Sequence, residues 1–341
     1  MKFYLRFIFL ASLALLFKFI FDVPLLPPEV SSLQNALHNK YLINDNQTLI
    51  INMKKVFKTR WPKKVLERLV NLGGNINAKS ADGSTPLGFS VLFGNKELVK
   101  YLIISGVQTD ELLLRFVLKR CNNAACLLIK CGANVNIQDP AGNDLLPFVI
   151  IAANKQVKDH LAAHGVFEKA IDNSKADQDS LKLVQLLLTK GANPNAQFNG
   201  QTALALSIMC NTEDITKLLL NHEANPNIRL ADKNGLTPLI VFVARTDTET
   251  VKAFLEKGAD VNYTDNTGKT ALFYVKDKAL AELLIDKCAD INFKDLDGNT
   301  ALNWAAQQKN EELVRLLLSK GVDVTIKNNN GKSALDSVQI E

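Results

Sequence analysis

Apolar and polar positions recur along most of this chain in one pattern, best seen over residues 297–328, "DGNTALNWAAQQKNEELVRLLLSKGVDVTIKN". A polar turn precedes a short helix, and a second helix follows with leucines at helical spacing, a glycine and another polar turn. One such repeat cannot cover its own apolar stripe. We therefore expect consecutive repeats to stack in a line, with Leu218 and Leu316 in separate layers rather than in one shared centre.

Two recurring signals place the repeats. The Thr or Ser before each short helix is a predicted N-cap, whose hydroxyl accepts a hydrogen bond from a helical N–H. These starts lie at 83–87, 200–204, 235–239, 268–272, 298–302 and 331–335. The glycine after most long helices suits a left-handed C-cap. The turns that hold this position lie at 73–77, 106–110, 132–136, 165–169, 191–195, 223–227, 258–262, 288–292 and 321–325, at steps of 33, 26, 33, 26, 32, 35, 30 and 33 residues.

This pattern resembles the ankyrin repeat, in which a turn and two helices span about 33 residues and carry the signature T-P-L-H-x-A. The resemblance covers about residue 62 to residue 341. It implies an all-α solenoid of stacked helix pairs with β-hairpin-like turns and a concave face.

The chain departs from the family pattern at two kinds of position. The sequence does not predict the polar network that the signature histidine makes in the family, because other residues stand in its place: Gly88, Ala205, Ile240, Phe273, Asn303 and Asp336. Glu223 and Cys288 replace the capping glycine, and we expect strain in their turns.

Four segments are expected along the chain. They are a signal peptide or membrane anchor (1–22), a proline-containing linker (23–45), an N-terminal capping unit (46–79) and a repeat array of about eight units (80–341). The array is expected to be degenerate between 111 and 196, where the 26-residue steps lack a recognisable turn before the short helix.

The N-terminus predicts an apolar helix that directs export or anchors the chain. Residues 7–17 are apolar except for Ser12, and Lys2 and Arg6 precede them. An apolar run of this length matches the core of a secretory signal. A spanning helix needs about 20 apolar residues, which would require Lys18 to reach the interface. Both possibilities stay open, so the expected location is membrane-anchored or secreted, with membrane association through residues 7–21.

The composition and motifs of the sequence argue against catalysis and metal binding. The chain is 47% hydrophobic and 22% charged, which is globular, and its net charge of +5 is small and scattered. The chain holds five cysteines, at positions 121, 126, 131, 210 and 288, and their number and spacing predict neither a disulfide framework nor a zinc site. His160 and His164 share a helix face but lack a third ligand, so a solvated face is the favoured interpretation. The sequence carries no recognisable catalytic motif, and we expect no enzyme, no cofactor and no metal.

Two aromatic-containing features have competing interpretations. Residues 53–68 hold seven Lys or Arg with Phe57 and Trp61. The favoured interpretation is the polar face of a capping unit, and the alternative is a site for anionic lipid or nucleic acid. Trp304 occupies a position that is usually apolar core in the family, so we expect it to pack in the core.

The resemblance implies a non-enzymatic protein–protein interaction scaffold, expected to be monomeric, whose hairpin tips and concave face bind a protein of unknown identity; nucleic acid is disfavoured. A further alternative is a secreted effector that binds a host protein, because the chain resembles ankyrin proteins of intracellular bacteria. Carried over by position, the candidate partner-binding residues are Phe198, Asn199, Gln201, Met209, Lys233, Asn234, Leu236, Arg245, Asn266, Thr267, Lys269, Leu296, Asp297, Asn299, Gln307 and Gln308.

Overall fold

The computed structural model describes residues 75–79, 84–153, 176–232 and 234–337. The chain divides into two compact units, Met1–Thr109 and Asp110–Glu341, which are treated separately below. The predicted N-terminal helix, the linker, the basic segment 53–68 and the pair His160 and His164 lie outside the described residues.

The described part of the first unit is one helix pair, α5 (Pro86–Leu92) packed on α6 (Lys96–Ile104). Thr85 caps α5, because its Oγ1 accepts a hydrogen bond from the Gly88 N–H at 3.0 Å, and Pro86 stands at the first helical position. Asn95 caps α6 through the Leu98 N–H. The pair is therefore built as the pattern of its sequence predicts.

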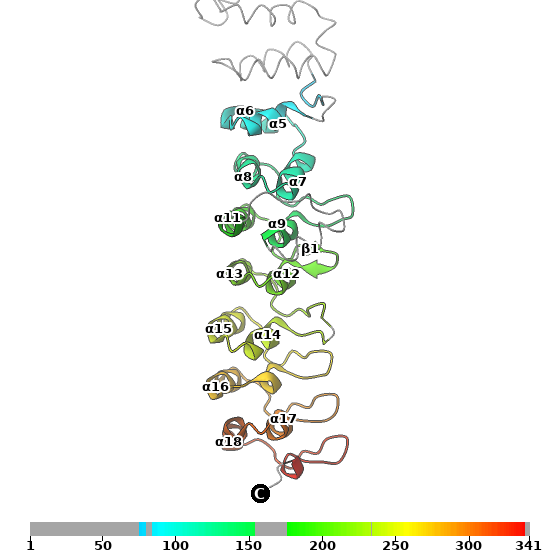
Figure 1. Ribbon diagram of the computed structural model, residues 1–341, viewed down its shortest axis with the longest axis vertical. Helices are drawn as coiled ribbons and strands as arrows, with labels where there is room; N and C mark the ends of the chain where they lie inside the picture. Colours follow the sequence, from blue (N-terminus) through cyan, green and yellow to red (C-terminus); the bar gives the residue numbers. More distant parts are fainter. Residues whose placement is uncertain (1–74, 80–83, 154–175, 233, 338–341) are drawn as a thin grey trace, which may run out of the picture. The chain divides into compact units, whose positions relative to one another are not determined.

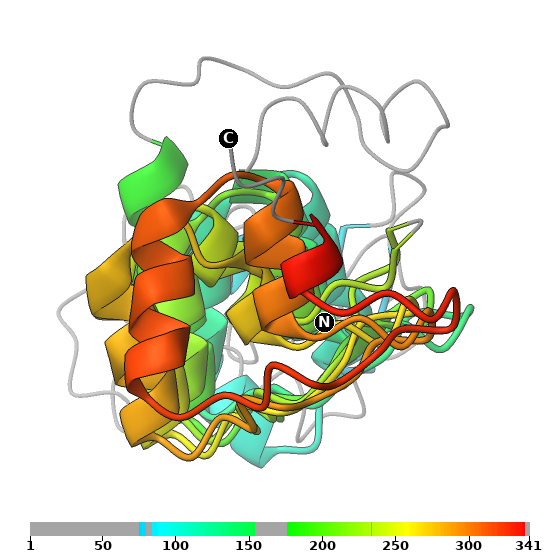
Figure 2. The same cartoon turned by 90° about the horizontal axis from the view of Figure 1, so that it is seen from below.

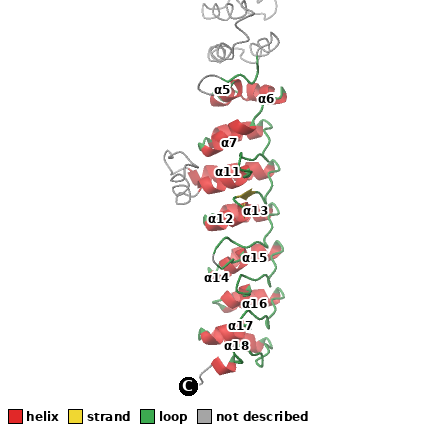
Figure 3. Cartoon of the chain, turned by 90° about the vertical axis from the view of Figure 1, so that its right-hand side faces the viewer, coloured by secondary structure: helices red, strands yellow, loops and turns green. Residues whose placement is uncertain are grey.

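The second unit is a stack of helix pairs (Figures 1 and 3). Each short helix packs on the long helix that follows it. The pairs are α7 (Asp110–Leu118) with α8 (Asn122–Lys130), α9 (Leu145–Ala153) with α11 (Ala176–Thr189), α12 (Ala203–Met209) with α13 (Glu213–Asn221), α14 (Pro238–Ala244) with α15 (Thr248–Glu256), η2 (Ala271–Tyr274) with α16 (Lys278–Asp286), and α17 (Ala301–Gln307) with α18 (Glu311–Ser319), followed by η3 (Leu335–Ser337).

Neighbouring pairs cover each other's apolar faces. The long helices contact one another along the stack, α11 with α13, α13 with α15 and α16 with α18. Helices α15 and α16 lie between α13, which carries Leu218, and α18, which carries Leu316 (Figure 1). The prediction of separate layers is confirmed, and the fold is a helical ankyrin-type solenoid.

Four of the six predicted short helices begin as expected, and those after Thr270 and Ser333 are only 3-10 turns, η2 and η3. Thr202, Thr237 and Thr300 each accept a hydrogen bond from the N–H three residues on. Thr270 precedes only a four-residue 3-10 turn, η2, and its hydroxyl is buried and makes no cap bond. The cause lies in the sequence, since this repeat has the 30-residue step and lacks residues for a full short helix.

Two of the six residues at the signature-histidine position, Asn303 and Asp336, accept hydrogen bonds through their side chains. The backbone N–H and hydroxyl of Thr300 donate to Asn303 Oδ1 at 2.9 and 2.7 Å. Ser333 donates in the same way to Asp336 Oδ2 at 2.7 and 2.8 Å. The Ser333 hydrogen bonds lower the pKa of the Asp336 carboxyl. A short acceptor at this position therefore strengthens the cap of its own helix, whereas Ala205, Ile240 and Phe273 are simply buried there.

Asparagine side chains join the turns that follow the long helices. Asn227 Oδ1 accepts from the Asp260 N–H at 2.7 Å, and its Nδ2 donates to the Gly258 carbonyl at 3.1 Å. Asn262 repeats both bonds one repeat later, to the Asp290 N–H and the Cys288 carbonyl. Equivalent bonds start from three other asparagines, Asn136, Asn195 and Asn292. This asparagine row ties the turns of consecutive repeats together.

Two of these turns hold non-glycine residues in a left-handed conformation. Glu223 has φ 67° and Cys288 has φ 66°, against 84° for Gly258 and 79° for Gly321 at the same position. A residue with a Cβ pays roughly 1–2 kcal/mol for this conformation. Both residues adopt the left-handed conformation from which the sequence predicts strain.

Glu223→Gly and Cys288→Gly should each stabilise the chain by about 0.5–1 kcal/mol, because relief of left-handed strain outweighs the entropy that glycine adds to the unfolded chain. The measurement is urea denaturation of the full chain. Gly258→Ala is the matched control and should move the midpoint the other way, since φ at Gly258 is 84° and nothing lies within 4 Å of an added Cβ. Midpoints lowered by the glycine variants would contradict the strain.

Asn262→Ala should destabilise the chain by about 1–2 kcal/mol, because two hydrogen bonds to the next repeat are lost. Asn262→Asp keeps an acceptor for the Asp290 N–H but turns an oxygen toward the Cys288 carbonyl and adds a charge beside Asp260 and Asp290, so it should cost at least as much. Asn221→Ala, at an exposed position of α13, is the control and should change little. Equal midpoints for all three variants would show that the asparagine row contributes nothing measurable.

Candidate partner-binding surface

The loops before the short helices project from one side of the second unit. We call them fingers; they comprise residues 137–144, 196–202, 228–236, 263–269, 293–299 and 326–332. Viewed along the stack, the long helices lie on one side, the short helices in the middle and the fingers on the other side (Figure 2). Fingers and short helices together form the candidate surface, which we call the finger surface.

Local hydrogen bonds shape each finger. In 196–202, strand β1 (Gln197–Phe198) pairs antiparallel with β2 (Gln201–Thr202) across Asn199 and Gly200, both at positive φ, as a tight hairpin turn requires. Elsewhere an Asp or Asn side chain closes the loop. Asp265 Oδ1 accepts from the N–H groups of Thr267 and Lys269, and Asp295 does the same for Asp297 and Asn299. The tips are therefore ordered before any partner binds.

Asp265 is ionised in its finger. Burial alone would raise its pKa, but hydrogen bonds from the Tyr274 hydroxyl and from Lys269 and Thr267 outweigh burial and lower the pKa. Tyr274 Oη lies 2.5 Å from Asp265 Oδ2. Burial and this carboxylate together raise the pKa of Tyr274. The tyrosine thus stays protonated and fixes the finger onto η2.

Backbone hydrogen bonds connect one finger to the next. The Asn266 N–H donates to the Asn234 carbonyl at 2.8 Å, and the Leu296 N–H donates to the Thr267 carbonyl at 3.0 Å. The Asn329 N–H donates to the Asp297 carbonyl at 2.9 Å. At the amino-terminal end of the row, the Asn199 N–H donates to Asn143 Oδ1. These bonds join the fingers 228–236, 263–269, 293–299 and 326–332 into one row and join finger 196–202 to finger 137–144, which fixes the spacing of the fingers within each group.

The candidate residues differ in how much surface they offer. Phe198 is only 8% exposed and packs edge-on against Phe148, with ring centroids 5.0 Å apart. Lys233 lies outside the described residues. Four are half-buried, namely Gln201, Leu236, Lys269 and Asn299. The remaining ten are exposed: Asn199, Met209, Asn234, Arg245, Asn266, Thr267, Leu296, Asp297, Gln307 and Gln308.

Trp304 is half-buried and differs from the expected core residue. The Lys269 ammonium lies 3.9 Å from the centroid of its ring, a cation–π contact between a finger and the short helix of the next repeat. Leu296, on the neighbouring finger, is 71% exposed. An added Cβ at Gly268 would come within 3.1 Å of Leu296 Cγ, so Leu296 lies close to this finger.

Two further cations contact aromatic rings. Arg229 lies 5.2 Å from the Tyr263 centroid, and its Nε donates to the Thr264 carbonyl. Arg245 lies 5.6 Å from the Phe242 centroid, and its Nη1 donates to Asn211 Oδ1. Sequence reasoning missed Arg229. Arg229 could have been identified by its position one repeat before the aromatic residue Tyr263, which becomes visible once the repeats are aligned.

The described residues offer little for catalysis or metal binding. Within them, no three His, Cys, Asp or Glu side chains group closely enough to hold a metal ion. None of the five cysteines forms a disulfide, and burial raises the pKa of the Cys210 thiol to about 11, so it is protonated at neutral pH. The longest and most apolar helices of the same residues are too short or too polar to cross a membrane.

These repeats define a helical solenoid protein. Two family models for ankyrin repeats match the chain. The model that consists of three repeat copies matches residues 174–265, 224–277 and 274–337, and the model that consists of many copies matches residues 62–103. The chain belongs to the ankyrin-repeat family.

Relatives of known name share the repeats over part of their length. E3 ubiquitin-protein ligase KEG of Arabidopsis thaliana is 23% identical over 242 residues, which cover 62% of this chain and 15% of that protein. Putative ankyrin repeat protein FPV031 of fowlpox virus is 35% identical over 193 residues, covering 51% and 48%. The ankyrin repeat domain of Bcl-3 aligns with a TM-score of 0.47 at 25% identity, covering 66% of this chain and 92% of that one. The chain spans less than half the length of both sequence relatives.

Gly268→Ala should destabilise the chain by about 1–3 kcal/mol more than Gly200→Ala, a glycine at the same place in another finger. Both have positive φ, but only at Gly268 would the new Cβ meet the Leu296 nitrogen, at 2.9 Å, and break the bond between fingers. Urea denaturation and hydrogen exchange of the Leu296 amide provide the measurement. Equal losses in the two variants would show that finger contacts are not needed for stability.

Proposed function

We propose that this chain is a non-enzymatic scaffold that binds a partner protein on the finger surface of the Asp110–Glu341 unit. Ankyrin repeats generally act as protein–protein interaction modules. The observation that carries the proposal for this surface is the row of hydrogen-bonded fingers, which project from one side of the stack and carry exposed residues.

Pre-ordered fingers favour binding. Ordering flexible loops and side chains at an interface reduces the binding free energy, by about 0.5–1.5 kcal/mol per immobilised side chain. Here Asp265, Asp295 and the bonds between fingers already fix the backbone, so less of that cost falls on binding. A stable interface buries about 1,200–2,000 Å², which a partner would reach only by spanning several repeats.

The location of the scaffold is a separate proposal. The apolar run 7–17 with its preceding Lys2 and Arg6 supports export or anchoring at a membrane. Sequencing of the mature N-terminus distinguishes a cleaved signal from an uncleaved anchor. A chain found entirely in the aqueous fraction with Met1 intact would contradict both.

Photo-crosslinking in the native cell tests the binding surface. A photoreactive amino acid at Asn266 or Gln307 should yield a discrete crosslinked protein, because both positions are exposed on the finger surface. The same amino acid at Lys252 or Glu249, exposed on the long helix α15, is the control and should yield none. Crosslinks from α15 but not from the fingers would place the partner on the long helices and reject the proposal.

A further inference from the structure

Charge is distributed unequally between the two sides of the carboxy-terminal repeats. Long helices α13, α15, α16 and α18 carry eight Asp or Glu and four Lys or Arg within their bounds. The short helical segments α12, α14, η2 and α17 carry no charged residue within theirs. The charge of the finger surface therefore comes from the fingers and from Arg245 at the end of α14.

Finger carboxylates are mostly engaged in the fingers themselves. Asp265 and Asp295 are buried and accept backbone N–H groups of their own loops. Asp232 Oδ1 accepts the Leu236 N–H. Among the cations of the described fingers, Arg229, Lys294, Lys327 and Lys332 are exposed, and Lys269 is half-buried against Trp304. The accessible charge of this side is thus predominantly positive.

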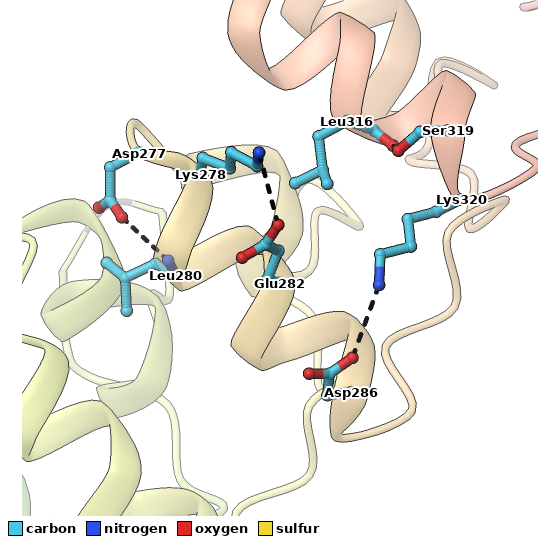
Figure 4. A network of polar contacts seen from close by, with 8 residues as sticks. All are labelled: Asp277, Lys278, Leu280, Glu282, Asp286, Leu316, Ser319 and Lys320. Atoms are coloured by element: carbon cyan, nitrogen blue, oxygen red, sulfur yellow. Dashed lines mark hydrogen bonds and ion pairs between the residues drawn. The ribbon is translucent and has the colours of Figure 1, made fainter.

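Ion pairs follow the same division. In the described part of the Asp110–Glu341 unit, one ion pair lies on α7 and four lie on the long helices α11, α16 and α18 or at the end of α18. Figure 4 shows two of them around α16, Lys278 with Glu282 and Lys320 with Asp286, both at 3.8 Å. By contrast, Arg229 and Arg245 contact aromatic rings and uncharged oxygens, and the Lys269 ammonium contacts the Trp304 ring, so these contacts do not neutralise their charge.

Apolar surface lies beside these cations. Leu296 is 71% exposed on the finger next to Lys269, and Trp304 lies under the Lys269 ammonium. A cation held on an aromatic face can accept a carboxylate from a partner without breaking an existing ion pair. An apolar side chain of the same partner can cover Leu296 and the free part of Trp304. The two contacts together suit a short segment with both kinds of side chain.

We propose that the finger surface around Lys269, Leu296 and Trp304 binds an acidic segment of a partner protein that also carries an aromatic or large aliphatic residue. This rests on the proposed function and names the chemistry of its partner. Charge complementarity of this kind raises the association rate and selects against basic partners. The excess of carboxylates on the long helices α13, α15, α16 and α18 disfavours binding of the same segment there.

A nucleic acid or an anionic membrane fits less well. Both present a continuous array of phosphates, which calls for a dense basic stripe. The cations here are single residues separated along the row, and Asp232 and Asp297 lie exposed among them. Separate carboxylates on a peptide can be placed to avoid these two aspartates, whereas a phosphate backbone cannot.

A peptide display selection tests the inference with the full chain as bait and a random 12-residue library as probe. Enriched peptides should be rich in Asp and Glu and contain Phe, Trp or Leu. Lys269→Glu and Trp304→Ala should each weaken a selected peptide about tenfold, while Lys252→Glu on α15 should leave it unchanged. A peptide with its acidic residues changed to Lys should bind Lys269→Glu better than it binds the natural chain. Lys269→Gln, which perturbs folding less, should give a smaller loss in the same direction.

The outcomes separate this inference from the proposed function. Neutral or basic peptides that are lost in Trp304→Ala would overturn the acidic partner and leave the finger surface as the binding site. Peptides that respond to Lys252→Glu and to no finger variant would overturn both. No enrichment at all would overturn the acidic partner. Tighter binding of a single-stranded RNA or of phosphatidylserine vesicles, lost in Lys269→Glu, would overturn it in favour of a phosphate ligand.

Discussion

Each helix pair of this chain depends on its neighbours to bury its apolar face. Leu219, Phe254, Leu284 and Leu317 belong to four consecutive long helices, and all four are fully buried although no single repeat could enclose them. Each buried leucine contributes roughly 1.5–3 kcal/mol, but only once the adjoining pair is in place. Stability therefore comes from the contacts between repeats. The same contacts set the spacing of the loops and side chains on the surface.

That spacing explains the two polar rows on the stack. The asparagine row joins the turns after the long helices, and the finger row joins the loops before the short helices, because equivalent atoms recur one repeat apart. The repeat built on η2 departs most from this regularity. It has lost most of its short helix, leaves the Thr270 hydroxyl without a partner, and holds Cys288 in a left-handed conformation. The ion pairs around α16 are exposed and add less than about 1 kcal/mol each, so they do not offset these losses. A partner that bridges this repeat would stabilise an irregular part of the array.

Much of the fold follows from local sequence, because caps and turns are set by a few adjacent residues. The Thr caps, the proline starts and the strain at Glu223 could all be predicted from residue type and position. The finger 137–144 escaped prediction because its sequence lacks the Thr-Pro start, yet Asp139 closes it through the N–H groups of Ala141 and Asn143. The caps made by Asn303 and Asp336 also escaped, since the family comparison drew attention to the missing histidine and not to the acceptors that stand in its place.

The surface was less predictable because its contacts join different repeats. Lys269 meets Trp304, and Arg229 reaches Thr264, in each case across 35 residues. Neither partner carries a signal in its own segment, and Trp304 alone suggests a core residue. When the repeats are aligned, both contacts have the same form, because each joins a finger residue of one repeat to a residue of the next repeat at the same separation in sequence. The same separation means that a bound segment would meet cations and apolar side chains at regular intervals, so that its affinity would accumulate over several weak contacts. Selectivity in such an array depends on the order of charged and apolar side chains along the partner, more than on any single pocket.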